Sequence, residues 1–217
     1  CDINPEIAAD AKDRFGFAKS CTAWQEVVND PTIDVVSVCT PNDSHAEIAI
    51  AALKAGKHVI CEKPIANTLE NAQAMAEAAA NAQEGRTLIN MCAYQYRRVP
   101  ALVMAKKLID EGSIGKILNI RATYLQSWSA DPSSPLSWRF QKKVAGAGTL
   151  GDIATHVIDI TQYLAGDIRQ VVSFMDTYIK ERPVQEGGVD LLGTVKLSAD
   201  AKKEVVDVDD EASFLIR

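Results

Sequence analysis

The pattern of apolar and polar positions divides the chain into two parts of different character. Up to about residue 90, short apolar runs alternate with longer segments that carry helix-start and helix-stop residues. The apolar runs predict buried strands over 35–40, 58–61 and 87–92. Helices are predicted over 5–15, 24–29, 45–55 and 68–84, with Asn4 as the first cap and Gly16, Gly56 and Gly85 as stops. This alternation predicts βαβ crossovers and a parallel sheet with helices on both faces.

In the second part, after about residue 100, the spacing of apolar and polar positions changes. A helix is predicted over 101–111, ended by Gly112, and the alternating segment 116–126 predicts a long half-buried strand. A polar loop over 127–143 leads through a glycine-rich stretch into a helix over 152–164. The later apolar runs lie at 171–179, 195–198 and 212–216. Together they predict an α+β arrangement with a mainly antiparallel sheet. We expect two domains, 1–97 and 98–217.

Both ends of the sequence suggest an internal piece of a longer protein. A doubly wound nucleotide-binding fold opens with a strand and a G-x-G-x-x-G turn, and neither precedes the helix predicted over 5–15. The chain also begins without Met and stops inside an apolar run. We therefore expect a Rossmann-like sheet that lacks its first strand and glycine turn, followed by an incomplete α+β domain.

The charge and composition of the chain limit the classes of partner that it is expected to bind. The 217 residues include 23 Lys+Arg and 29 Asp+Glu, so the net charge is −6, which disfavours nucleic acid and anionic membranes. The apolar runs are far shorter than the roughly 20 residues that cross a bilayer.

The five cysteines form no C-x-x-C pair. Cys39, Cys61 and Cys92 fall in strand-like runs, where we expect small buried side chains rather than a zinc site or a disulfide framework. Reduced thiols favour a cytoplasmic location.

Two polar turns follow predicted strands. Thr40-Pro41-Asn42-Asp43-Ser44-His45 comes after the first strand and Glu62-Lys63-Pro64 after the second. Ligands bind at the carboxyl ends of strands in open α/β sheets. Simpler interpretations stay open, because Asp43 or Ser44 also suits a helix cap and Lys63 also suits a solvated loop.

A third motif opens the helix predicted over 152–164. Asp152, His156 and Asp159 follow three spaced glycines and share one helical face. A histidine with a carboxylate one turn away suits a general base. A core histidine is the plain alternative, and zinc is disfavoured because no cysteine or second histidine lies nearby. The glycines, Gly146, Gly148 and Gly151, follow no apolar strand, so we do not interpret them as a dinucleotide turn.

The ordered set of motifs resembles one family. The set comprises T-P-N-x-x-H at 40–45, G-K-H-V-I-C-E-K-P at 56–64, Y-x-Y-R at 94–97, W-R at 138–139 and G-x-G-x-x-G-D-x-x-x-H-x-x-D at 146–159. It resembles the glucose–fructose oxidoreductase/inositol dehydrogenase/rhizopine catabolism (Gfo/Idh/MocA) family over essentially the whole chain.

This resemblance implies an NAD-dependent sugar or polyol dehydrogenase, with NADP as the alternative cofactor. The catalytic residues implied are Lys63, Asp152 and His156, which would meet at one substrate oxygen. Asp2 would bind the adenosine ribose. The other cofactor-side residues implied are Thr40, Pro41, Asn42, His45, Glu62, Lys63, Arg97, Trp138 and Arg139, the last three near the nicotinamide or substrate. A small sugar, anhydrosugar or polyol is the expected partner, and assembly into a homo-oligomer through the C-terminal sheet is expected as well.

Two rival functions stay open at this point. One is a redox-neutral relative that cleaves glycosides while holding NAD tightly. The other is a truncated module without activity.

Overall fold

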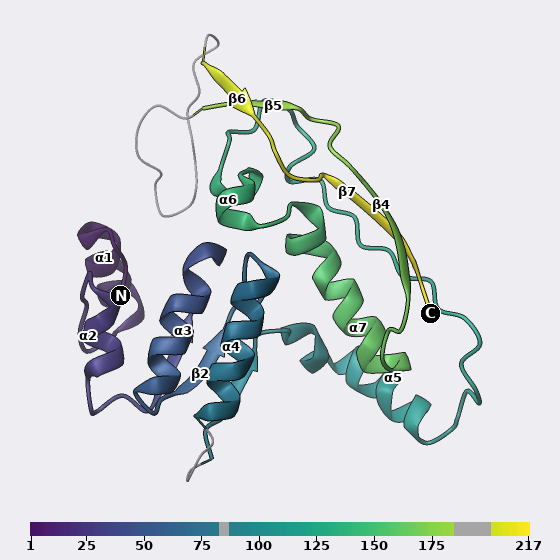
Figure 1. The fold of residues 1–217 in the computed structure, drawn as a ribbon, viewed down its shortest axis with the longest axis horizontal. Coiled ribbons are helices and arrows are strands. Elements are labelled where there is room, and N and C mark those ends of the chain that lie inside the picture. The colour runs from purple at the N-terminus through teal and green to yellow at the C-terminus, as the bar shows by residue number, and fades with distance from the viewer. Residues whose placement is uncertain (83–86, 185–200) are drawn as a thin grey trace. The chain divides into compact units, whose positions relative to one another are not determined.

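The computed structural model describes residues 1–82, 87–184 and 201–217. The described chain forms two compact units, one built by residues 1–92 and one by the residues from Ala93 onward (Figure 1). This is an α/β unit followed by an α+β unit, so the expected fold class is confirmed.

The first unit has a parallel sheet of three strands in the order β1-β2-β3. The strands are β1 (Val35–Val38), β2 (His58–Cys61) and β3 (Asn90–Cys92). Val38 pairs with Cys61, and Cys61 with Cys92, so the carboxyl ends of the strands are level. The helices are α1 (Pro5–Phe15), α2 (Trp24–Asn29), α3 (His45–Lys54) and α4 (Leu69–Asn81).

These helices match the sequence prediction closely. Asn4 caps α1 by accepting hydrogen bonds from the amides of Glu6 and Ile7, and Gly16 ends it at a φ of 72°. Thr68 caps α4 through the amide of Asn71, at 3.1 Å. The predicted end of α4 at Glu84 and Gly85 lies outside the described residues.

One face of the sheet carries the core. Val36, Val38 and Val59 pack with side chains of α3 and α4, among them Leu53 and Met75. The other face of the described sheet is open: Val35 is 49% and Met91 47% exposed. The prediction of helices on both faces is therefore wrong for the described residues, where α3 and α4 cover the same side.

The cysteine prediction was correct at one position. Cys61 is 1% exposed and packs in the core. Cys39 is exposed, contrary to expectation, because β1 ends at Val38 and Cys39 belongs to the turn that follows. Cys92 is partly buried.

The second unit places helices beside antiparallel strand pairs. Its helices are α5 (Pro100–Asp110), α6 (Lys142–Ala145) and α7 (Thr155–Ala165), the last continuing a π-helical turn, η4 (Leu150–Ala154). Strand β4 (Val171–Asp176) pairs antiparallel with β7 (Glu211–Ile216). Strand β5 (Glu181–Pro183) pairs antiparallel with β6 (Lys203–Val205), and this second pair is absent from the sequence prediction. The predicted strand 195–198 lies outside the described residues.

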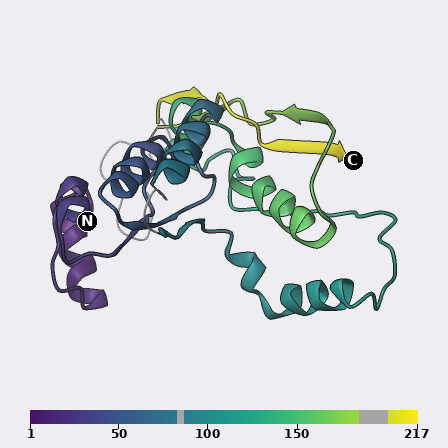
Figure 2. The same ribbon diagram turned by 60° about the horizontal axis from the view of Figure 1, so that its bottom comes forward.

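The strand predicted over 116–126 is wrong. This segment follows α5 as an extended, largely exposed stretch that is drawn without an arrow (Figures 1 and 2). An alternating pattern forms a strand only when a neighbour supplies the ladder of hydrogen bonds, and no described strand pairs with it. Within the described ranges, no helix is both long and apolar enough to cross a membrane.

Candidate active site

Two polar turns lie at one edge of the first unit's sheet. Strand β1 leads into the turn from Thr40 to Ser44, which contains a 3₁₀ turn, η1 (Asn42–Ser44). Strand β2 leads into Glu62-Lys63-Pro64. Because β1 and β2 are parallel and level, both turns lie at the same edge, as the sequence predicted from the strand order.

His45 joins the two turns. Its Nε2 lies 2.8 Å from the carbonyl oxygen of Thr40 and its Nδ1 lies 3.0 Å from the carbonyl oxygen of Pro64. The side chain is fully buried, at 0% exposure. His45 therefore contacts the main chain of both turns and connects them.

Asn42, Glu62 and Lys63 belong to these two turns, whereas Asp2 lies elsewhere in the first unit, before α1. Asn42 is buried, at 7% exposure, and the Ser44 hydroxyl donates to the carbonyl of Pro41 at 2.8 Å. The backbone amide of Lys63 donates to Oε2 of Glu62 at 3.2 Å. Asp2 lies just before α1, where its Oδ1 accepts a hydrogen bond of 2.8 Å from the amide of Asn4.

His156 is enclosed by aromatic rings in the second unit. It lies on α7 and is 5% exposed. The Tyr96 ring lies 4.5 Å away between centroids, and Tyr94 and Tyr124 each lie 6.2 Å away. Such an apolar enclosure keeps water from the imidazole, so a proton transfer there would proceed in a desolvated place.

The tyrosines carry a short hydroxyl chain. The hydroxyls of Tyr96 and Tyr124 lie 2.7 Å apart, and Gln126 Nε2 donates to the Tyr124 hydroxyl at 2.6 Å. The hydrogen bond with Tyr124 raises the pKa of Tyr96, so this phenol resists ionisation more than an ordinary tyrosine does.

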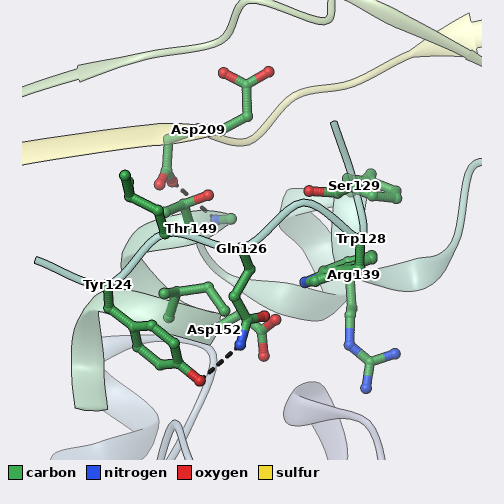
Figure 3. A pocket seen from close by; sticks show the side chains of 13 residues that line it. Tyr124, Gln126, Trp128, Ser129, Arg139, Thr149, Asp152 and Asp209 are labelled. Carbon is green, nitrogen blue, oxygen red and sulfur yellow. Dashed lines mark hydrogen bonds between the residues drawn. The ribbon is translucent and has the colours of Figure 1, made fainter. Parts of the chain in front are cut away.

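A small cavity opens beside this cluster. Its volume is about 100 Å³, and Tyr124, Trp128, Arg139 and Asp152 lie on its wall. In the view of Figure 3, Tyr124 lies at one end, Trp128 and Arg139 lie at the other, and Asp152 lies between them. The cavity thus combines a carboxylate, a guanidinium and flat aromatic faces. Trp138, also predicted for the site, stacks on the Arg139 guanidinium at 4.4 Å.

Arg97 forms a hydrogen-bonded ion pair with Asp159. Its Nε lies 2.9 and 3.0 Å from the two carboxylate oxygens, and its Nη2 lies 2.6 Å from Oδ1. This hydrogen bonding raises the pKa of Arg97. Asp159 is only 6% exposed, so the pair ties the turn that carries Arg97, η2 (Gln95–Arg98), to α7.

Asp209 organises the glycine-rich entry to the helix. Its carboxylate accepts hydrogen bonds from the amides of Gly148, at 2.8 Å, and Leu150, at 2.6 Å. A carboxylate therefore occupies the place where a helix N-terminus would bind an anion. This supports the sequence interpretation that these glycines are not a dinucleotide turn.

Gly148 is required here for a steric reason. A Cβ atom at this position would lie 1.8 Å from the Asp209 carbonyl oxygen. Asp209 was not predicted from the sequence, although the acidic cluster at 207–211 between two apolar segments was a signal.

The structure brings some predicted residues together and leaves others to separate units. Asp152 and Arg139 share one cavity, and His156 lies on the same helical segment as Asp152. Lys63, His45 and Asn42 belong to the first unit. Over the described ranges, no group of three or more His, Cys, Asp or Glu side chains is arranged to hold a metal ion.

Comparisons with known proteins agree with this description. Residues 1–89 match a family model described as an oxidoreductase family with an NAD-binding Rossmann fold. Residues 102–217 match the model of the GFO/IDH/MocA C-terminal domain. The resemblance noted from the motifs and the expected nicotinamide cofactor are thereby confirmed.

Three relatives show the breadth of the similarity. Levoglucosan dehydrogenase of Pseudarthrobacter phenanthrenivorans is 55% identical over 216 residues, which is 100% of this chain and 54% of the relative. An NADP⁺-dependent scyllo-inositol 2-dehydrogenase of Bacillus subtilis is 35% identical over 72% of this chain and 42% of the relative. A solved levoglucosan dehydrogenase in complex with NADH and levoglucosan has a TM-score of 0.86 at 51% identity, covering 99% of this chain and 52% of that one. The chain thus spans about half the length of the relatives it matches.

Proposed function

The chain belongs to the Gfo/Idh/MocA family of oxidoreductases, and from that premise we propose that its protein oxidises a secondary alcohol of a small sugar, anhydrosugar or polyol. The reaction is reversible and uses NAD, which accepts the hydride when bound. The observation that carries the proposal is that the buried His156 follows Asp152, a residue of the cavity wall, on one helical segment.

His156 takes the proton of the reacting hydroxyl. Its enclosure by three tyrosine rings keeps the transfer away from bulk water. Asp152, one turn earlier on the same helical face, orients the imidazole and stabilises its cation. Lys63 hydrogen-bonds the same substrate oxygen and favours the alkoxide that develops on it.

The dinucleotide would lie over the carboxyl edge of the parallel sheet. The chemistry of this edge fits that group, because two polar turns meet there and His45 fixes them to one another. Asp2 would accept hydrogen bonds from the adenosine ribose and repel a 2′-phosphate, so NAD is the preferred cofactor over NADP.

The cavity favours a neutral, polyhydroxylated substrate. Its wall offers the Trp128 and Tyr124 rings for the faces of a sugar and polar groups for its hydroxyls. Similarity to a levoglucosan dehydrogenase and to an inositol dehydrogenase supports this class.

The test is NADH formation by the complete protein with levoglucosan as the probe. His156→Ala should lower kcat about 10²- to 10⁴-fold, the usual contribution of a general base. His58→Ala is the matched control, because His58 lies in the first unit and accepts from the Ile89 amide at 2.9 Å. Equal activity of the two variants would refute the role of His156. Hydride exchange without net NADH would favour redox-neutral chemistry, and no effect of NAD on stability would favour an inactive module.

We also propose that the protein forms homo-oligomers through the sheet of β4 and β7. Val172, Phe174 and Leu215 on these strands are between 59% and 80% exposed. Light scattering should show a discrete oligomer that Phe174→Lys weakens. A monomer at all concentrations would contradict this.

A further inference from the structure

Arg182 is a buried cation in the second unit. It lies on β5 and is 1% exposed, although arginine is rarely buried completely. Burial lowers the pKa of its guanidinium, while Asp210 and Asp131 favour the charged form. A cation in such a place needs hydrogen-bond acceptors around it.

The acceptors are backbone carbonyls of a single loop, which we call the sugar loop (129–134). Nη1 donates to the carbonyl of Asp131 at 2.8 Å and, at 3.4 Å, to that of Ser134. Nη2 donates to the carbonyl of Ser129. The guanidinium thus holds both ends and the middle of the sugar loop at once.

Stacking on Phe140 and a backbone hydrogen bond add to these contacts. The Arg182 guanidinium stacks on the Phe140 ring at 4.2 Å, and Trp128 packs on the same ring at 5.7 Å between centroids. The amide of Leu136 donates to the carbonyl of Pro183, beside Arg182, at 2.8 Å. Leu136, after the sugar loop, is therefore bound directly to β5, and Trp128, before the loop, is connected to Arg182 through the Phe140 ring.

The held segment forms part of the cavity wall. Trp128 and Ser129 line the cavity together with Asp152, as Figure 3 shows, whereas Arg182 itself does not line it. Any displacement of the Ser129 carbonyl would move the Trp128 indole relative to Asp152. Arg182 thus acts on the cavity indirectly, through the sugar loop and through the Phe140 ring, which also lines the cavity.

We propose that Arg182 is a positioning residue that fixes the sugar loop through three backbone carbonyls and so sets the shape of the substrate pocket. Its functional part rests on the proposed sugar site. The planar guanidinium of arginine directs several N–H donors toward separate carbonyls at once. The ammonium of lysine is a single compact charge and would reach fewer of them.

The experiment compares Arg182→Met and Arg182→Lys in the complete protein, with Arg169→Met as the control for the same change at an exposed arginine. In Arg182→Met, KM for levoglucosan should rise about tenfold, because a displaced Trp128 weakens the binding of substrate and transition state alike. KM for NAD and kcat should change less than about twofold, because dinucleotide and reacting groups are untouched. Arg182→Lys should lie between wild type and the Met variant, and Arg169→Met should match wild type.

Hydrogen-exchange mass spectrometry separates this inference from the proposed function. Amides of residues 127–136 should exchange faster in Arg182→Met, while those of α3 keep their wild-type rates. If wild type oxidises no sugar, the proposed function fails, and the exchange data alone decide on the anchoring. Unchanged exchange over 127–136, or an equal loss in kcat and in both KM values, would overturn the proposal. If Arg182→Met does not fold, Arg182→Lys decides the question. A KM for levoglucosan and hydrogen-exchange rates equal to those of wild type in Arg182→Lys would also overturn the proposal.

Discussion

Removal of the Asp209 carboxylate is a direct test of how the helix with Asp152 and His156 is held in place. In Asp209→Ala, the amides of Gly148 and Leu150 lose acceptors at 2.8 and 2.6 Å. Loss of a helix cap costs about 0.5–2 kcal/mol. A second amide left without its charged acceptor adds about 1 kcal/mol or more where water replaces it poorly. Because Asp209 is partly exposed, we take the lower value for the second amide and expect about 1.5–3 kcal/mol in total.

Urea unfolding followed by tryptophan fluorescence measures this cost. Trp128 and Trp138 belong to the second unit, so Trp24→Phe in the background removes the signal of the first. The matched control is Asp207→Ala, because Asp207 is exposed and accepts one amide hydrogen bond, from Lys142 at 2.6 Å. The control should lose about 1 kcal/mol or less. A loss at Asp209 no greater than that at Asp207 would refute the anchoring of the helix by Asp209.

Three other predictions can be checked on the same protein. Burial raises the pKa of Cys61 to about 12, so at pH 8 iodoacetamide should label exposed Cys39 while Cys61 stays unmodified by mass spectrometry until the protein unfolds. Arg97→Met leaves the buried Asp159 carboxylate without its bidentate partner. Because the Arg97 side chain is 46% exposed, urea unfolding should show a loss of about 2 kcal/mol, less than the roughly 3–5 kcal/mol of a fully buried pair. An unchanged free energy of unfolding would contradict the stabilising role of the pair. Asp2→Ser should lower the preference for NAD over NADP in kcat/KM, since it removes the carboxylate that repels a 2′-phosphate, and an unchanged ratio would show that Asp2 does not set it.

Local signals explain which elements the sequence could predict. Helix α1 was predictable at both ends because Asn4, Pro5 and Gly16 act within one turn of it. The segment 116–126 was not, because its alternation says what a strand would bury but not whether a partner strand is present. The open face of the first sheet escaped prediction for the same reason, since Val35 is apolar whether or not a helix covers it.

The site shows the same division. The motifs identified Asp152 and His156 as residues of one helical face, a consequence of their spacing alone. Asp209 and Arg182 act through backbone groups about 50 to 60 positions away, and no periodicity records such pairings. His45 was assigned to the cofactor side, but only the fold shows its two ring nitrogens on the carbonyls of Thr40 and Pro64.

The most direct test of the account is a crystal structure of the complete protein with NADH and levoglucosan. The account predicts Lys63 Nζ and an imidazole nitrogen of His156 both within about 3.2 Å of one sugar hydroxyl oxygen, with Asp152 on the same wall. A sugar bound away from His156, or Lys63 and His156 on opposite faces of the molecule, would contradict it.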